Sequence, residues 1–360
     1  MKKLKIGIIG QLTFPFTEPF KGGIEVFTHT LAKLLIERGH EVVVFATKGT
    51  DQSINPYIVG KHTDSFIRDD VYNKIMNDIL PNSDFDIIHN NSVSRVPIKF
   101  SNKLPMPMVT TLHSASFDDY GVHHADNNNN TYVTISNYMH NKWFNLVQNN
   151  MIYNGVNLEK FVPLINKSKE NYAIWFGRIT PEKGTIYAIE AAKMAGIQLK
   201  IAGPIFNYEY FKKTIKPKFK SFLFKKNVKY LGHLSHVELQ NSIAKAKATI
   251  FIPEPNETYG FAIAESLACG TPVAAFNTGP ASDLLNEKSG VLALPNNIKS
   301  LSEALKKTIL LNPKDCRKRA YEIGDINTMV DKYEKLYYKL HAAKSYSSTI
   351  KSIAPKANVI

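Results

Sequence analysis

The 360-residue chain is poor in cysteine, with only Cys269 and Cys316. Two cysteines are too few for a disulfide framework or a metal cluster, and Cys269 falls in an apolar helical stretch, so we expect a packed thiol there. No run of about 18 apolar residues occurs, which excludes a membrane-spanning helix. The first ten residues lead into a strand without a secretory leader. We therefore expect a folded, cytoplasmic protein.

Acidic residues are scarce in the second half of the chain. Residues 1–150 hold 14 Lys and Arg against 14 Asp and Glu, whereas residues 151–360 hold 31 against 17. The whole net charge of +14 therefore comes from the second half, which suggests an anionic ligand there. A lysine-rich background of solvated helix faces explains the same excess equally well.

The glycine pattern of nicotinamide-dependent oxidoreductases is also missing. Those enzymes place Gly-x-Gly-x-x-Gly directly after a strand. Here the first expected strand is followed by Gly10-Gln11-Leu12-Thr13, which does not supply it.

The sequence does contain a regular alternation of short apolar runs and amphipathic stretches, which is typical of parallel sheets covered by helices. The alternation restarts after the turn-rich residues 154–157. We therefore predict an α/β protein of two facing, doubly wound, Rossmann-like domains, residues 1–153 and 154–326. Ligands of such sheets bind at the carboxyl ends of the strands, here in the cleft between the domains. A last helix over 327–344 and a frayed tail over 345–360 follow.

The expected strands are Leu4–Ile9, Val42–Ala46, Ile87–His89, Pro107–Leu112, Tyr132–Ile135, Met151–Tyr153, Tyr172–Phe176, Leu199–Ala202, Val228–Leu231, Ala248–Pro253 and Pro272–Phe276. The expected helices are Glu25–Arg38, Ser136–Val147, Thr185–Ala195, Ser235–Ala246, Phe261–Cys269, Ile298–Leu311 and Asn327–Lys344.

Two carboxylates, Glu257 and Glu265, mark the most informative stretch of the chain. An apolar strand feeds this stretch, and a helix opening at about Gly260 would aim its unpaired N–H groups at an anion. Glu257 precedes the helix and Glu265 lies inside it, so the two can contact different parts of one elongated ligand. Ordinary helix-surface carboxylates are the alternative interpretation.

Three further elements fall at expected strand ends. Gly22-Gly23 begins the first helix and would let backbone approach a phosphate, although a plain turn explains it as well. Arg178 and Lys183 flank a turn after a strand, where two cations can neutralise a diphosphate or simply be solvated. His113 can bind a sugar hydroxyl or phosphate, but a lone histidine is more often structural.

Three other segments of the sequence carry weaker signals. Asp84-Phe85-Asp86 has the spacing of a metal and diphosphate motif, but Asp86 opens a strand. His123-His124 lacks partners at metal spacing. Residues 208–229, the Lys/Phe-rich segment, hold eight lysines and four phenylalanines. An amphipathic domain helix is favoured for this segment, and a surface for anionic lipid or nucleic acid is the alternative.

The ordered set of these motifs resembles the retaining GT-B glycosyltransferases of family 4, also called glycosyl transferases group 1. The resemblance runs from residue 4 to about 342. It includes Gly22-Gly23-x-Glu25, the pair Arg178 and Lys183, and Glu257 with Glu265 before Ala-Cys-Gly-Thr-Pro-Val. Shorter phrases also fit: Gly39-His40-Glu41-Val42, Tyr153-Asn154-Gly155-Val156, Gly203-Pro204 and Leu231-Gly232-His233-Leu234.

The resemblance implies roles for individual residues. Arg178 and Lys183 would hold the donor diphosphate, and Gly22-Gly23 would approach it from the other domain. Glu265 would bind the ribose, and Glu257 would contact the transferred sugar together with the backbone N–H groups of the next residues. The implied donor set also includes Gly203, Gly232, Tyr259, Gly260 and Phe261, while Glu25 and His113 are assigned to the acceptor side. Glu257, His113, Arg178 and Lys183 are the implied catalytic residues.

The implied reaction moves a hexose-type sugar from a nucleotide sugar, a UDP-sugar by expectation, to a glycan, lipid-linked or small-molecule acceptor, as in bacterial surface polysaccharide synthesis. No metal or other cofactor and no nucleic-acid partner are expected, and peripheral contact with the cytoplasmic membrane face stays open. The last helix would cross back to the first domain.

Three alternatives remain at this point. A nucleotide-sugar epimerase or a glycan phosphorylase can share the architecture, and a phosphorylase would carry pyridoxal phosphate. A basic nucleic-acid or membrane-binding module without catalysis would bind polyanions in a salt-sensitive way.

Overall fold

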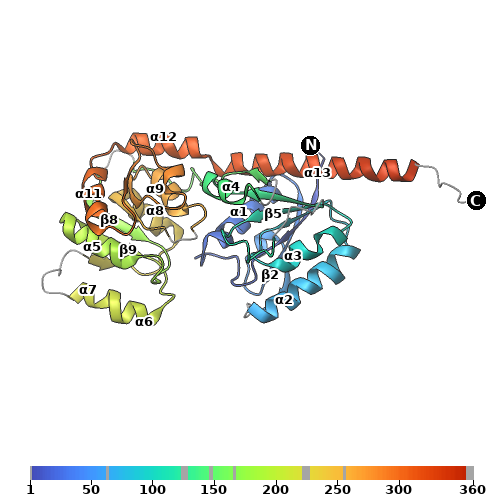
Figure 1. Ribbon diagram of the computed structural model, residues 1–360, viewed down its shortest axis with the longest axis horizontal. Coiled ribbons are helices and arrows are strands. Elements are labelled where there is room, and N and C mark those ends of the chain that lie inside the picture. Colours follow the sequence, from blue (N-terminus) through green and yellow to red (C-terminus); the bar gives the residue numbers. More distant parts are fainter. Residues whose placement is uncertain are drawn as a thin grey trace, which may run out of the picture.

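The structure is a computed structural model that describes residues 2–61, 65–122, 129–145, 149–164, 168–220, 228–253 and 257–353. Two α/β units lie side by side, each with a parallel sheet covered by helices (Figure 1). The expected fold class is thereby confirmed.

The first sheet has seven strands in the order β3-β2-β1-β4-β5-β6-β7, and every described pairing is parallel. β5, Met-Val-Thr-Thr-Leu, is buried at every position, as expected for a central strand covered on both faces. The strands are β1 (Lys5–Ile9), β2 (Glu41–Thr47), β3 (Pro56–Gly60), β4 (Ile87–Asn90), β5 (Met108–Leu112), β6 (Asn130–Thr134) and β7 (Asn149–Met151). The helices are α1 (Gly23–Glu37), α2 (Ser65–Lys74), α3 (Arg95–Phe100) and α4 (Asn137–Trp143), with short helical turns η1 (Gln52–Ile54), η2 (Ile75–Ile79), η3 (Leu80–Asn82) and η4 (Ser101–Lys103).

The second sheet has six parallel strands in the order β10-β9-β8-β11-β12-β13. The strands are β8 (Glu170–Phe176), β9 (Gln198–Ala202), β10 (Val228–Tyr230), β11 (Ala246–Phe251), β12 (Val273–Phe276) and β13 (Gly290–Ala293). The helices are α5 (Thr185–Ala195), α6 (Tyr208–Tyr210), α7 (Lys216–Lys220), α8 (His236–Lys245), α9 (Phe261–Ala268), α10 (Ala281–Leu284), α11 (Ile298–Thr308) and α12 (Pro313–Ile323), with a π-helical turn η5 (Phe211–Ile215).

Helix starts follow the side chains that cap them. Ser235 and Glu238 form a reciprocal capping box at the start of α8, and Ser136 accepts the N–H of Met139 at the start of α4. α9 has no such side chain: it begins after Gly260, which adopts a left-handed conformation with φ of 82°. The helix start that the sequence predicts at Gly260 is therefore confirmed.

The chain crosses between the domains twice, at neighbouring positions. Val156 pairs with Asp325 in an isolated parallel bridge, and the Ile326 N–H donates to the Val156 carbonyl at 3.2 Å. After the second crossing, α13 (Ile326–Ile353) runs across the first domain and extends past it (Figure 1). The helix thus continues beyond Lys344, through nine residues expected to be frayed; residues 354–360 lie outside the described part.

Buried polar contacts dock α13 on the first sheet. The Tyr333 hydroxyl lies 2.9 Å from the Thr111 hydroxyl, and the Tyr337 hydroxyl lies 2.5 Å from Nδ1 of His89. Both tyrosines are fully buried in the core of the first domain. The last helix therefore belongs by packing to the first domain, although the chain reaches it from the second.

Candidate functional site

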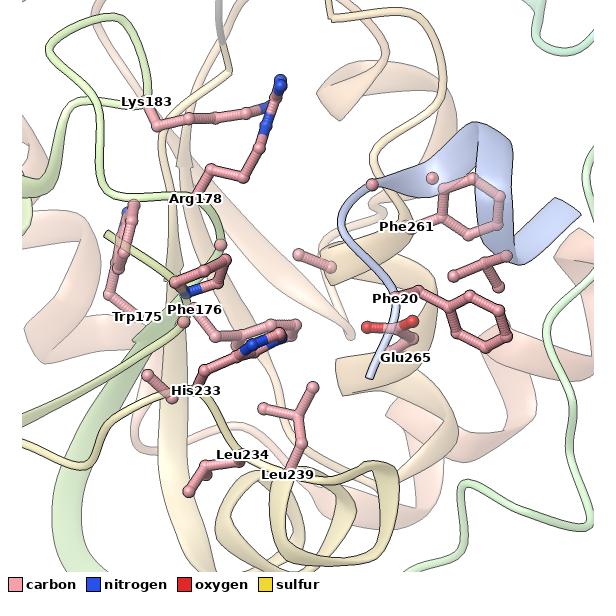
Figure 2. Close-up of a pocket in the computed structure, with 18 of the residues that line it drawn as sticks. Phe20, Trp175, Phe176, Arg178, Lys183, His233, Leu234, Leu239, Phe261 and Glu265 are labelled. Atoms are coloured by element: carbon pink, nitrogen blue, oxygen red, sulfur yellow. The ribbon is translucent and has the colours of Figure 1, made fainter. Parts of the chain in front are cut away.

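A cavity of about 260 Å³ lies between the domains, at the carboxyl ends of the central strands of the second sheet (Figure 2). The first domain contributes the loop that precedes α1, and the second contributes the loops after β8, β9, β10 and β11. Eight residues predicted to bind the donor line this cavity: Gly22, Gly23, Arg178, Lys183, Gly203, Glu257, Phe261 and Glu265.

Arg178 and Lys183 lie in the turn between β8 and α5 and extend toward the rim of the cavity (Figure 2). This turn runs beside the loop that follows β9, and the Gly177 N–H donates to the Ala202 carbonyl at 3.0 Å. A Cβ on Gly203 would lie only 1.9 Å from the Gly177 carbonyl oxygen. Glycine at 203 therefore permits the close approach that brings the two loops to one cavity wall.

Glu257 contacts Lys183 and Gly260, two residues that the sequence also predicts to bind the ligand. Its Oε2 lies 2.8 Å from Nζ of Lys183, and its Oε1 accepts the Gly260 N–H at 3.1 Å. Burial acts to raise the pKa of Glu257, but Lys183 and the N–H groups of Gly260 and Tyr259 outweigh it and lower the pKa overall. Glu257 is therefore an ionised carboxylate that fixes Lys183 at the cavity wall.

Glu265 has a different environment although it faces the same cavity (Figure 2). It lies on α9 and also lines a smaller cavity of about 50 Å³ beside the two chain crossings. Burial raises the pKa of Glu265 to about 8. Around neutral pH the side chain is therefore largely a neutral carboxyl, able both to donate and to accept hydrogen bonds.

The first domain meets the second through Gly23. A Cβ on Gly23 would lie 2.8 Å from the ring of Phe261, the first residue of α9, so the missing side chain permits the close approach of α1 and α9. Glu25, in the first turn of α1, is buried. Burial raises the pKa of Glu25, and the charge of Arg178 opposes this rise. Glu25 therefore lies within the electrostatic reach of Arg178, and its assignment to the acceptor stays a prediction.

His113 is not among the residues that line the cavity. It follows β5 and is buried, with Nε2 at 3.2 Å from Oδ1 of Asn91 and its ring edge-on to Phe27. Burial lowers the pKa of His113 to about 3, so the imidazole is neutral. Its carbonyl accepts the Thr258 hydroxyl at 3.3 Å, which ties it to the loop carrying Glu257. Its functional role stays a prediction.

Three more predicted residues support the cavity without lining it. Tyr259 is fully buried and its hydroxyl donates to the Asn154 carbonyl. Gly260 starts α9, and Gly232, with φ of 87°, precedes two residues that do line the cavity.

The sequence did not single out the apolar and aromatic part of the wall. Phe20 comes from the loop before α1, and Trp175, His233, Leu234 and Leu239 come from the second domain (Figure 2). The resemblance pointed to this part of the wall through the phrase Leu231-Gly232-His233-Leu234, but the residues themselves did not. Trp175 carried no signal, because an aromatic side chain near the end of a strand is expected to be part of the core.

The weaker motifs lie elsewhere. Asp84 pairs with Nζ of Lys5 at 2.6 Å, and Asp86 accepts the Lys5 N–H. Both aspartates lie at the amino end of β4, whereas His113 follows the carboxyl end of β5, so they lie at opposite ends of the parallel strands. The Lys/Phe-rich segment is helical from Tyr208 to Lys220, with Phe211 buried, as favoured. Its residues 221–227 and the pair His123-His124 lie outside the described residues.

In the part of the chain that the structure describes, no group of three or more His, Cys, Asp or Glu side chains is arranged to hold a metal ion. No helix there is both long and apolar enough to span a bilayer. Both cysteines are unpaired and buried, so the packed thiol expected at Cys269 is confirmed.

The chain matches two protein-family models. The model "Glycosyltransferase Family 4" matches residues 21–160, and "Glycosyl transferases group 1" matches residues 157–323. An uncharacterized glycosyltransferase of Methanocaldococcus jannaschii is 26% identical over 85% of this chain and 89% of its own. An Escherichia coli enzyme named UDP-Gal:alpha-D-GlcNAc-diphosphoundecaprenol alpha-1,3-galactosyltransferase is 29% identical over 52% of this chain and 53% of its own.

Solved structures share the fold at low identity. Sucrose-phosphate synthase from Thermosynechococcus elongatus superposes with a TM-score of 0.78 at 17% identity, covering 95% of this chain and 100% of that one. HepE from Anabaena, in complex with UDP and glucose, superposes with a TM-score of 0.72 at 18% identity, covering 94% and 100%. Two facing parallel-sheet domains around a shared cavity define the GT-B architecture. With the two family matches, the chain belongs to the GT-B glycosyltransferases.

Proposed function

We propose that the protein is a retaining glycosyltransferase of family 4 that moves a hexose from a UDP-sugar to a glycan, lipid-linked or small-molecule acceptor. The observation that carries this proposal is the wall of the inter-domain cavity, where Arg178, Lys183 and the start of α9 meet the carboxyl of Glu265. Cations and a helix start suit a diphosphate, and a carboxyl one turn further suits a ribose. The UDP and glucose bound by HepE and the UDP-Gal named for the E. coli relative support the donor class.

The chemistry follows from where charge develops. Breaking the anomeric C–O bond leaves an oxocarbenium-like sugar and transfers the bonding electron pair to the departing diphosphate. Arg178, Lys183 and the N–H groups at the start of α9 stabilise that growing negative charge, and one such donor is typically worth about 3–4 kcal/mol of barrier. We propose that these groups act without a metal ion.

Glu257 acts on the sugar side of the same bond. It is ionised and fixed by Lys183 and Gly260, so it can accept hydrogen bonds from sugar hydroxyls and stabilise positive charge on the sugar. We assign no covalent nucleophile. Retention is proposed to arise from attack on the same face within the ion pair of sugar and diphosphate, with the acceptor entering from the first domain, near His113 and Glu25.

The biological setting follows from the acceptors of relatives. The diphosphoundecaprenol acceptor named for the E. coli relative supports a lipid-linked acceptor and a role in bacterial surface polysaccharide synthesis. We propose that the protein works at the cytoplasmic face of the membrane and makes no nucleic-acid contact.

The test begins with a thermal-shift screen against UDP-, GDP- and ADP-sugars, which ranks the base by its stabilisation of the protein. We then expect Glu265→Ala, Arg178→Ala and Lys183→Ala each to reduce nucleotide-sugar turnover at least tenfold, with unchanged circular dichroism. Lys314→Ala, at an exposed lysine on α12, is the matched control. Unchanged turnover in all three variants would refute the site.

Turnover without an acceptor separates the alternatives. An epimerase would convert the nucleotide sugar into an isomer and consume no acceptor, and a non-catalytic module would bind polyanions without any turnover. A transferase releases the nucleoside diphosphate in step with the glycosylated acceptor.

A further inference from the structure

The loop after β9 presents Phe206 to the side chain of Arg178. The Arg178 Cζ lies over the Phe206 ring, 5.5 Å from its centroid. Phe206 is 38% exposed and is not part of the wall of the cavity described above, so core packing does not account for it. An arginine over an aromatic face is held by the attraction of its charge to the ring.

Backbone hydrogen bonds fix the two loops in register. Ile179, the residue after Arg178, donates its N–H to the Pro204 carbonyl at 2.8 Å. The Ile179 carbonyl in turn accepts the N–H groups of Phe206 and Asn207 at 3.3 and 3.2 Å. These hydrogen bonds therefore fix the backbone that carries Phe206 relative to the backbone that carries Arg178.

The first domain covers the same ring from the opposite side of the cleft. The Phe14 ring stands edge-on to Phe206, with centroids 5.9 Å apart and planes at 76°. The loop that carries Phe14 is held at Thr13, whose hydroxyl accepts from Nη1 of Arg68 at 2.5 Å and from the side-chain amide of Gln11 at 3.1 Å. The edge-to-face geometry is the favoured one for aromatic pairs.

We propose that Phe206 is a positioning residue for Arg178, and that Phe14 completes this support when the domains are in contact. A long arginine side chain has many rotamers, and each diphosphate contact must restrict them. Phe206 restricts the rotamers of Arg178 before the diphosphate binds. Because Phe14 belongs to the first domain, its contribution to this restriction requires that domain to be in contact with Phe206. This inference rests on the proposed role of Arg178 in binding the donor diphosphate.

The first experiment measures UDP binding by calorimetry in a double-mutant cycle. We expect Phe206→Leu to weaken UDP binding about five- to tenfold, Phe206→Tyr to restore it to within twofold, and Phe14→Leu to weaken it about two- to threefold. In an Arg178→Ala background, Phe206→Leu should change binding by less than twofold. Unchanged binding in Phe206→Leu would overturn the proposal, as would an equal loss in the Arg178→Ala background, which would mean that Phe206 touches the nucleotide directly or only shapes the loop.

The second experiment needs no nucleotide. The chain has six arginines, so its arginine Nε–H spectrum is sparse, and Arg178→Lys identifies the Arg178 signal. We expect that signal to be shifted by the ring current of Phe206, to keep its shift in Phe206→Tyr and to lose it in Phe206→Leu. A signal indifferent to Phe206→Leu would overturn the proposal. Failure of the proposed function would instead show as a wild-type chain that binds no UDP, GDP or ADP.

Discussion

Glu265 should make the stability of the ligand-free protein depend on pH in a direction opposite to that of most carboxylates. The unfolded chain ionises this carboxyl near its ordinary pKa of 4.5, whereas burial holds it protonated in the folded protein up to about pH 8. As pH rises between these values, the unfolded state loses its proton first. Stability should therefore fall with rising pH, and Glu265→Gln should not share that loss.

The size of the effect follows from the shift. At about 1.4 kcal/mol per pKa unit, the wild type should lose roughly 3 kcal/mol relative to Glu265→Gln between about pH 5 and pH 8. Because the side chain is partly open to the cavity, solvent screening reduces this figure, and we expect a loss of roughly 2–3 kcal/mol. At pH 8 the glutamine variant should therefore be the more stable protein, and it should also be the weaker nucleotide binder.

The assay is urea unfolding at pH 5 and pH 8, followed in the second domain alone. The chain has two tryptophans, Trp143 in the first domain and Trp175 in the second, so fluorescence in a Trp143→Phe background reports the second. Glu287→Gln, at an exposed glutamate of the same domain, is the matched control. A gap between wild type and Glu265→Gln that is the same at both pH values would refute the assigned environment.

The same proton should appear in ligand binding. An ionised carboxylate is the stronger acceptor for two ribose hydroxyls, so donor binding should release a proton from Glu265. The association constant for UDP-glucose should then rise by up to tenfold per pH unit from about pH 6 toward pH 8, and Glu265→Gln should flatten this dependence. A pH-independent wild type would contradict the assignment of Glu265 to the ribose.

Two further changes test how the domains meet at the site. Gly23→Ala places a Cβ 2.8 Å from the Phe261 ring. This overpacking, which costs roughly 1–3 kcal/mol, should hold α1 and α9 apart and raise the KM for the donor. Gly60→Ala, with open space around its Cβ, is the control and should leave the KM unchanged. Asn91→Asp places a carboxylate beside His113 and should raise the pKa of that imidazole by roughly 1–3 units, as measured by NMR. Asn91→Ala is the control and should leave the ring neutral. Equal titration of His113 in both variants would mean that the 3.2 Å contact between the two side chains is not kept in solution.

The parts of the fold that could be predicted are those with dense apolar patterns. The central strands of both sheets and the start of α9 agree with the expected positions to within a few residues. β3 and β13 were missed because they lie at sheet edges and are only partly buried. α12 was missed because its sequence, Pro-Lys-Asp-Cys-Arg-Lys-Arg-Ala-Tyr-Glu-Ile, buries only Cys316, Ala320 and Ile323, which leaves little apolar periodicity.

The candidate site likewise has a part that the sequence predicts and a part that it does not. Eight residues selected from spacing and resemblance line one cavity. Six of them follow strands of the second sheet, and they meet because the carboxyl ends of parallel strands lie at the same end of the sheet. Gly22 and Gly23 come from the first domain, and only the packing of the two domains brings them to the cavity. His113 ends a strand of the other sheet, and its distance from the cavity depends on how the domains close. No spacing rule contains that information.

The sequence by itself determined the two-domain parallel architecture and the residue types that can hold a diphosphate, since both follow from local periodicity and from glycines and charges at strand ends. Only the tertiary structure decided how those charges are divided. It paired Glu257 with Lys183, 74 positions away, and left Glu265 in a wall that raises its pKa to about 8. Two similar carboxylates thus acquire opposite protonation states, because a pKa is set by neighbours and burial that only the folded chain brings together.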